Sequence, residues 1–300
     1  MTRLQANSLL ALTAAIWGSS FVVQQVGIGN LGTISFTGAR FFVGALIVFP
    51  FAFRQFRRVE KVERKFRLKD WLSLLATGIV LFTAAALQQH GILRTTVTNA
   101  GFLTALSVPM VPFLGLFFLR RRVHFVVWPA SIGCFIGTYI MSGAKGLEFA
   151  EGDLWVIAST IFWAVHVMLV GAMAVITRAP LVVAVVQFAV CGIIGLIFGY
   201  FIESPVMADF SGAILGICYV GIFSVGMAFT FQVVGQRYTP AADAAIILSS
   251  ETIFAALGGM LILGERLTIM QFLGGALIFS SIIAVELLPH TRIGKARTLK

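Results

Sequence analysis

The chain has 300 residues, of which 59% are hydrophobic and 11% charged, and its mean hydropathy is +0.97. A soluble domain carries about 25% charged residues, and a chain this apolar could not hide its surface from water. The composition therefore excludes a soluble globular protein and favours an all-α membrane protein. The net charge of +10 would suggest a nucleic-acid partner only if the basic residues formed one patch, and they do not.

Hydrophobic runs separated by charges and turn residues predict ten spanning helices of about 20 residues each. The first run follows Arg3 and lacks a small-residue cleavage motif, so we interpret it as an uncleaved span. Ten spans would use nearly the whole chain, and we expect no soluble domain. In chain order the predicted spans are 8–27, 34–53, 71–90, 98–118, 125–144, 154–176, 181–202, 212–235, 241–263 and 269–288.

The basic residues predict the orientation of these spans. With the N-terminus inside, most of the 22 Lys and Arg residues fall on the inner side, eight of them in segment 54–69. Only Arg94, Lys145 and Arg266 fall outside. This bias predicts a multi-pass protein of the cell membrane with both termini in the cytoplasm. The basic segment is expected to contact anionic lipid rather than nucleic acid.

The sequence offers no sign of a cofactor or a metal. Cys134, Cys191 and Cys218 all fall inside predicted spans without the spacing of metal ligands or of a disulfide framework. The nucleotide-binding and zinc-binding motifs, such as a Walker loop, are missing from the sequence. We therefore expect neither a cofactor nor ATP hydrolysis.

The two halves of the chain resemble each other. Residues 93–116 align with 236–259, so that Arg94 meets Arg237 and Ser107 meets Ser250. Five spans are followed by five, and an odd number in each half requires the second half to be inverted. We predict two five-helix repeats, residues 1–148 and 149–300. Inverted repeats are typical of secondary transporters, whose substrate site lies at the midplane between the halves.

Three segments resemble the EamA family of the drug/metabolite transporter superfamily: "AAIWGSSFVVQQ" (14–25), "FTGARFFVGAL" (36–46) and "SSETIFAALGGMLILGERLTIMQFLGGALI" (249–278). Within it, the chain looks most like the aromatic amino-acid exporter (YddG-like) group. The resemblance implies a ten-span exporter of amino acids or other small metabolites without a cofactor. The family often has Pro after the mid-span Glu, where this chain has Thr252. The first half lacks a counterpart of the G-E-R-L turn that contains Glu265, to which we assign a structural or gating role.

Glu251 lies near the middle of the ninth predicted span, on the same side as Ala244, Ala255 and Gly258. A carboxylate in hydrocarbon is costly unless it is paired or protonated. One interpretation is a cavity-facing group that binds a substrate amine or exchanges a proton. The other is a protonated carboxyl that holds neighbouring helices together. Asp243, near the inner end of the span, is expected to serve as a helix cap or gate.

Two further polar residues lie inside predicted spans. Arg40 is expected to form a structural ion pair or to snorkel outward, and its alternative role is to bind a substrate carboxylate. His166 shares a helix face with Trp163. It is either a hydrogen-bonded structural histidine or a donor beside an aromatic cavity wall.

The remaining candidates would complete a mainly apolar cavity. Trp17 and Trp163 suit a flat or aromatic ligand, and Pro109 and Pro112 would free backbone carbonyls in the fourth span. The candidate polar lining consists of Gln89, Asn99, Ser107, Gln232 and Ser250.

These features together predict a secondary transporter, most simply an amino-acid exporter that works by alternating access, with a small-molecule substrate and the bilayer as its partners. Export of other drugs or metabolites is an alternative. A membrane-embedded lipid-modifying enzyme is another, but its acids and histidines should cluster at one membrane face, and the four histidines here are scattered. The oligomeric state is left open.

Overall fold

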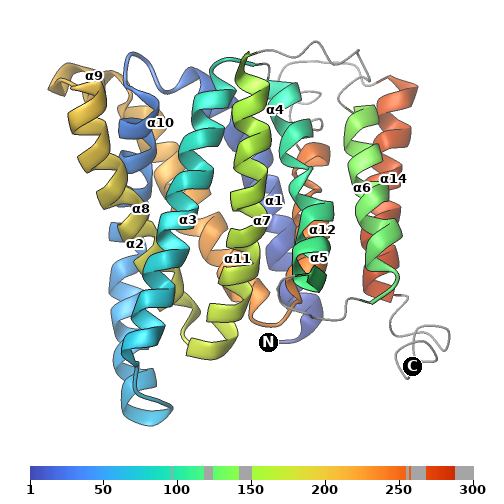
Figure 1. Cartoon of the computed structure of the whole chain (residues 1–300), viewed down its shortest axis with the longest axis horizontal. Coiled ribbons are helices and arrows are strands. Elements are labelled where there is room, and N and C mark those ends of the chain that lie inside the picture. The colour runs from blue at the N-terminus through green and yellow to red at the C-terminus, as the bar shows by residue number, and fades with distance from the viewer. Residues whose placement is uncertain (96, 118–123, 142–150, 255–256, 258–267, 288–300) are drawn as a thin grey trace.

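The computed structural model of the chain describes residues 1–95, 97–117, 124–141, 151–254, 257 and 268–287. Every regular element in these residues is a helix, which confirms the predicted class. The long helices run roughly parallel or antiparallel to one another and form a bundle more than one helix deep (Figure 1). A chain in a bilayer must satisfy its backbone hydrogen bonds within each segment, and helices do so.

The first half contains six described helices. The second of them, α2, has 30 residues and is about 45 Å long, so it exceeds the roughly 30 Å of hydrocarbon and carries part of the basic segment on its last turns. The helices are α1 (Arg3–Val26), α2 (Thr33–Val62), α3 (Leu68–Ile92), α4 (Val97–Thr104), α5 (Ser107–Phe117) and α6 (Val127–Met141).

The second half begins with two long helices and continues through shorter pieces. Its eighth predicted span is a continuous run in which a π-helix, η1, separates two α-helical segments, and Gly221 and Gly226 lie inside that π-helix. The elements are α7 (Glu151–Thr177), α8 (Pro180–Glu203), α9 (Met207–Gly212), α10 (Ile214–Tyr219), η1 (Val220–Phe229), α11 (Thr230–Gln236), α12 (Ala241–Leu248) and α14 (Ile269–Leu287).

Seven segments of the described chain are long and apolar enough to cross a membrane, and two shorter apolar helices, Val127–Met141 and 269–285, accompany them. These nine segments correspond to nine of the ten predicted spans. The ninth predicted span, 241–263, lies partly outside the described residues. The count of ten therefore stays a prediction.

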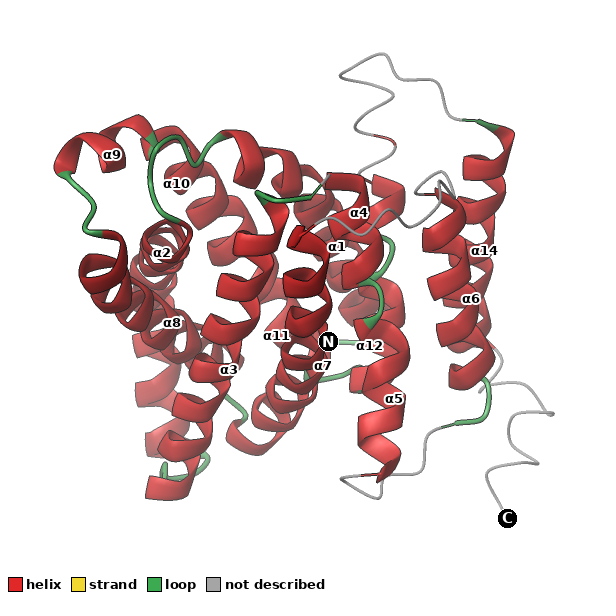
Figure 2. Ribbon diagram, turned by 45° about the horizontal axis from the view of Figure 1, so that its top comes forward, coloured by secondary structure: helices red, strands yellow, loops and turns green. Residues whose placement is uncertain are grey.

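The fourth predicted span is broken between α4 and α5, at residues 105 and 106 (Figure 2). Pro109 has no N–H to donate to the carbonyl of Ala105, which instead accepts from Val108 N at 3.0 Å. Because the N–H of Val108 is used in this way, it does not bond to the carbonyl of Thr104. That carbonyl accepts from Ser107 Oγ at 2.8 Å instead. Pro109 thus accounts for the break, and the hydroxyl of Ser107 bonds one of the carbonyls that the break leaves without a backbone donor.

The ninth predicted span is broken at residues 249 and 250, after α12, and resumes as a helical turn at 251–254. Here the break has no proline. Ser249 Oγ donates to the carbonyl of Ile246 at 2.6 Å, and Ser250 Oγ donates to that of Ile247 at 2.7 Å. Serine side chains compete with the backbone ladder in this way and can bend a helix.

Helices α2 and α8 pack against each other along a stripe of small residues. A Cβ added at Gly195 would lie 2.6 Å from the Cα of Gly38, and one added at Gly199 would lie 2.9 Å from the Cα of Ser35. A Cβ at Gly192 would likewise lie 2.9 Å from the Cα of Phe42. Since residue numbers rise on one helix as they fall on the other, the two helices are antiparallel. We call this contact the glycine seam.

The pair α6 and α14 repeats the pattern at the opposite edge of the bundle (Figures 1 and 2). A Cβ added at Gly137 would lie 2.7 Å from the carbonyl oxygen of Gly274. Gly133 meets Ser281, so these helices are antiparallel too. The second and last helices of each half thus pack antiparallel to their counterparts, as an inverted repeat requires.

Candidate functional site

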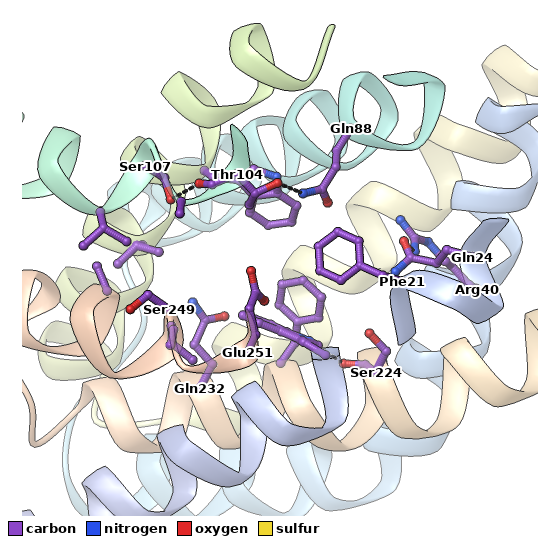
Figure 3. Close-up of a pocket in the computed structure, with 18 residues that line it drawn as sticks. Phe21, Gln24, Arg40, Gln88, Thr104, Ser107, Ser224, Gln232, Ser249 and Glu251 are labelled. Carbon is purple, nitrogen blue, oxygen red and sulfur yellow. Dashed lines mark hydrogen bonds between the residues drawn. The ribbon is translucent and has the colours of Figure 1, made fainter. Parts of the chain in front are cut away.

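A cavity lies between the two halves, close to both helix breaks (Figure 3). The first half lines it from α1, α2, α3 and the α4–α5 break, and the second half from α7, η1, α11 and the break after α12. Its lining residues are Trp17, Phe21, Gln24, Arg40, Gln88, Thr104, Ala105, Ser107, Val108, Trp163, Val167, Ser224, Phe229, Gln232, Ala245, Leu248, Ser249 and Glu251.

Aromatic rings form one wall of the cavity. The ring of Phe229 lies 4.6 Å from Trp17 and 5.9 Å from Trp163, measured between centroids, and stacks on the latter at 22°. Trp17 Nε1 donates to the carbonyl of Ser224 in η1 at 3.4 Å. The indole N–H of Trp163 is buried and has no partner among the described residues. This wall is an apolar aromatic surface, and its Trp163 N–H group is left unsatisfied by the described residues.

Polar side chains line the cavity at the helix breaks and from the neighbouring helices α3 and α11. Gln88 Nε2 donates to Thr104 Oγ1 at 2.9 Å, beside Ser107 on the other side of the α4–α5 break (Figure 3). Ser249 lines the cavity from the break in the other half. Gln232 is buried, and its Oε1 accepts no hydrogen bond from the described residues. The breaks therefore place hydroxyl groups, and helices α3 and α11 place amide groups, at a mainly apolar site.

Arg40 is a buried lining residue, with only 4% of its surface exposed. Its Nη1 donates to Gln24 Oε1, and its guanidinium lies 5.7 Å and 5.3 Å from the ring centroids of Phe36 and Phe41. No carboxylate of the described residues forms an ion pair with it. The structure therefore places Arg40 at the cavity, with an amide as its hydrogen-bond partner.

Glu251 enters the cavity from the second half, in the helical turn after the break. It is partly buried and makes no hydrogen bond or ion pair with the described residues. Figure 3 shows its carboxylate pointing into the open centre, away from Arg40 and Gln24 at the side. The cavity thus contains one cation and one acid that do not contact each other.

Several predicted residues lie near the cavity but do not line it. His166 is fully buried, and its Nε2 lies 2.7 Å from Gln187 Oε1. Gln89 is also buried and donates to the carbonyl of Gln24 at 3.1 Å. The hydroxyl of Ser250 is bonded to its own helix. Gln88 and Ser249, the immediate sequence neighbours of Gln89 and Ser250, line the cavity instead.

The other predicted residues are structural or lie beyond the described chain. Pro109 and Pro112 lie in α5, and Pro109 explains the break before it. Asn99 lies in α4, but its side chain is outside what the structure describes, and Glu265 is outside the described residues altogether. No role for either can be read from the structure, so both assignments stay predictions.

Asp243, in the first turn of α12, joins the two halves near the N-terminal end of α1. Arg3 Nη2 lies 2.8 Å from Asp243 Oδ2, and Thr239 Oγ1 donates to Asn7 Oδ1 at 2.6 Å. One turn further along α1, Leu10 packs in a buried cluster with α12. These contacts connect the two halves near the N-terminal end of α1, and we call them the N-terminal closure.

Sequence reasoning missed several lining residues, and for some of them a signal existed. Trp17, Phe21 and Gln24 are spaced by four and three residues, which puts them on one face of α1. Because Trp17 was already a candidate cavity residue, Gln24 on the same helix face could have been added to the predicted lining. Thr104, Ser224 and Phe229 gave no such signal, because small hydroxyl residues and phenylalanines occur throughout the spans.

The chain is similar to known transporters over almost its full length. The sequence profile of the EamA-like transporter family matches residues 5–143 and again 150–287. An uncharacterized transporter from Archaeoglobus fulgidus is 29% identical over 290 residues, covering 95% of this chain and 87% of that protein. The uncharacterized inner membrane transporter YicL from Salmonella typhimurium is 25% identical over 295 residues, covering 94% of each.

The fold is also found among solved structures. One crystal structure superposes with a TM-score of 0.72 and covers 95% of this chain and 97% of its own, at 16% sequence identity. At that identity the similarity concerns the fold alone. The names of the two relatives state transport and give no substrate.

Proposed function

Because the chain belongs to the EamA-like transporter family, we propose that it is a secondary transporter that exports amino acids or related small metabolites by alternating access. The two halves would rearrange around the central cavity and expose it to each side of the membrane in turn. The matched relatives support transport as such. The substrate class and the direction are our proposal, and the direction rests on the resemblance to exporters.

The observation that carries this proposal is the position of the cavity. Both halves line it, and each contributes a helix that is broken at the cavity, at residues 105–106 and 249–250. Broken helices at the interface of inverted repeats form the substrate sites of many secondary transporters, because they offer polar groups at mid-membrane depth.

The walls of the cavity favour substrates with an aromatic or hydrophobic side chain. Trp17, Trp163 and Phe229 form a contiguous aromatic surface, and Phe21 lines the same cavity. A stacked ring contributes about 1 kcal/mol beyond its area burial. We therefore expect phenylalanine-like or tryptophan-like amino acids to be preferred over small polar ones.

Purified protein in liposomes tests this function directly. Uptake and counterflow should be measured over a panel of amino acids, with and without an imposed proton gradient, and against empty liposomes. We expect saturable transport of at least one hydrophobic amino acid. Movement of a drug or another metabolite alone would identify the alternative exporter class, and no movement of any compound would contradict the proposal.

We further propose that the N- and C-termini face the cytoplasm. Lys61, in the last turn of α2, and Met207, at the start of α9, lie at opposite ends of the bundle (Figure 1). In a cysteine-free background, a cysteine at Lys61 should react with an impermeant reagent only from the cytoplasmic side. One at Met207 should react only from outside. The reverse pattern would contradict this orientation.

A further inference from the structure

The cavity is lined by a cation, Arg40, that no carboxylate of the described residues neutralises. Arg40 is buried in α2, its Nη1 is bonded to Gln24, and its Nε has no hydrogen-bond partner among the described residues. The arginines that form ion pairs in the described chain, Arg3, Arg64 and Arg94, lie near helix ends. Arg40 alone among these four lines the cavity. A guanidinium presents several donors in a fork that matches a carboxylate.

The same cavity is lined by an acid, Glu251, with which no described cation forms an ion pair. Glu251 belongs to the other half of the chain, and no described side chain or backbone group bonds to its carboxylate. In the view of Figure 3 the ring of Phe21 lies between Glu251 and the Arg40–Gln24 pair. The guanidinium and the carboxyl group therefore line one cavity from different halves of the chain.

A buried charge without a partner is costly, so a cavity lined by a guanidinium and a carboxyl group constrains which ligands can fill it. A ligand with one charge would neutralise one side and leave the other exposed to an apolar surrounding. A ligand with a carboxylate and an ammonium would neutralise both. Arg40 and Glu251 form no ion pair with each other or with any other described residue.

We propose that Arg40 and Glu251 determine specificity as a pair: Arg40 binds the carboxylate of a zwitterionic substrate and Glu251 binds its ammonium group. This inference rests on the proposed transport function and narrows it. Amines that lack a carboxylate and acids that lack an amine are poor substrates, however well their apolar part fits the aromatic wall. The site thereby rejects the cationic and anionic relatives of its substrate.

The test compares three ligands that share one ring system: L-phenylalanine, phenethylamine, which lacks the carboxylate, and 3-phenylpropanoate, which lacks the ammonium. Binding to the purified wild-type protein is measured by titration, and transport by counterflow in liposomes. We expect L-phenylalanine to bind about tenfold or more tightly than either analogue. Equal binding of all three would overturn the proposal without any variant being needed.

Two variants then assign each charge to its group. Arg40→Gln should weaken the binding of L-phenylalanine to the level at which the wild type binds phenethylamine. It should leave the binding of phenethylamine itself unchanged. Glu251→Gln should weaken the binding of L-phenylalanine to the level at which the wild type binds 3-phenylpropanoate. It should leave the binding of 3-phenylpropanoate itself unchanged. The same substitutions at exposed positions on the last turns of α2, Arg58→Gln and Glu60→Gln, serve as matched controls and should alter none of the three.

Other outcomes contradict the pair in distinct ways. Equal weakening of all three ligands in Arg40→Gln, with Arg40→Lys equally impaired, would show a structural role for Arg40. Loss of gradient-driven accumulation in Glu251→Gln, with ligand discrimination intact, would show that Glu251 carries a proton instead of binding the amine. If wild-type protein transports some compound but prefers none of the zwitterions, this inference fails while transport stands. If liposomes show no transport at all, the proposed function fails with it.

Discussion

The glycine seam between α2 and α8 and the broken spans around the cavity are opposite solutions to helix packing. In the seam, small residues let two continuous helices approach until their backbones touch, as at Gly38 and Gly195. At the cavity, α4–α5 and α12 with the turn after it are interrupted, and their free carbonyls are bonded by serine hydroxyls. In the seam, backbone lies against backbone, and at the cavity polar groups face an open space.

The difference indicates which parts can move. Backbones in close contact over several turns have few alternative arrangements, because any shift creates overlap or a void. A broken helix already lacks part of its ladder, and rotation about the break costs few further hydrogen bonds. We therefore expect the seam to act as the fixed axis of the bundle and the broken spans, with the N-terminal closure, to rearrange around it.

The largest expected effect comes from adding one methyl group to the seam. In Gly38→Ala the new Cβ would lie 2.6 Å from the carbonyl carbon of Gly195 and closer still to the backbone of Leu196, which cannot yield as a side chain would. We expect destabilisation of about 3 kcal/mol or more, seen as loss of folded protein after purification. The matched variant Gly101→Ala, in α4, meets no atom within 4 Å and should be neutral or slightly stabilising. Equal stability of the two variants would contradict the seam.

A smaller loss of stability is expected where the end of α8 accepts hydrogen bonds from the start of α2. Glu203, at the end of α8, accepts hydrogen bonds from the backbone N–H groups of Ile34 at 2.9 Å and Ser35 at 2.8 Å. Its charge also suits a helix N-terminus. Glu203→Gln should lower the apparent melting temperature, because it should reduce the free energy of unfolding by about 1–3 kcal/mol. Asp209→Asn, which alters only a short helix at the surface, is the control, and an equal shift in both would show that this end of the seam contributes nothing.

The smallest effect is expected at the cavity wall. Trp163→Ala removes a ring stacked on Phe229 and should weaken binding of an aromatic amino acid roughly fivefold, about 1 kcal/mol, while the protein stays folded. Trp155→Ala, also on α7 but 40% exposed and away from the cavity, should leave affinity unchanged. Titration of both variants with L-phenylalanine measures the difference. Unchanged affinity in Trp163→Ala would place this ring outside the binding site.

The fold class and the family could be predicted from the sequence, because hydrophobic runs and the block at 249–278 are signals that do not depend on packing. The break in the fourth span could be predicted from Pro109. The break itself lies before the proline, at Ala105, because the carbonyl of Ala105 is the one that an N–H at position 109 would have bonded. The break in the ninth span was not predicted. Thr252 stands where the family often has Pro, and two serines produce the break instead.

The candidate site was predicted only in part, because spacing alone does not fix which residue of a neighbouring pair faces a cavity. Adjacent residues on a helix point about 100° apart, so Gln88 and Gln89 could not be told apart without knowing the helix's rotation. The same holds for Ser249 and Ser250. Arg40 could not be assigned because its partner, Gln24, lies on another helix. Whether the residues that line the cavity bind substrate stays a prediction.

The central claim, that the halves separate at the N-terminal closure while the seam holds, is tested most directly by a disulfide across that closure. In a background without Cys134, Cys191 and Cys218, Asn7→Cys and Thr239→Cys would be combined, since these side chains are hydrogen-bonded across the halves. Counterflow in liposomes would be measured after oxidation, after reduction, and in each single-cysteine variant. We predict that oxidation abolishes transport and that reduction restores it. Full transport by the quantitatively cross-linked protein would contradict alternating access through this closure.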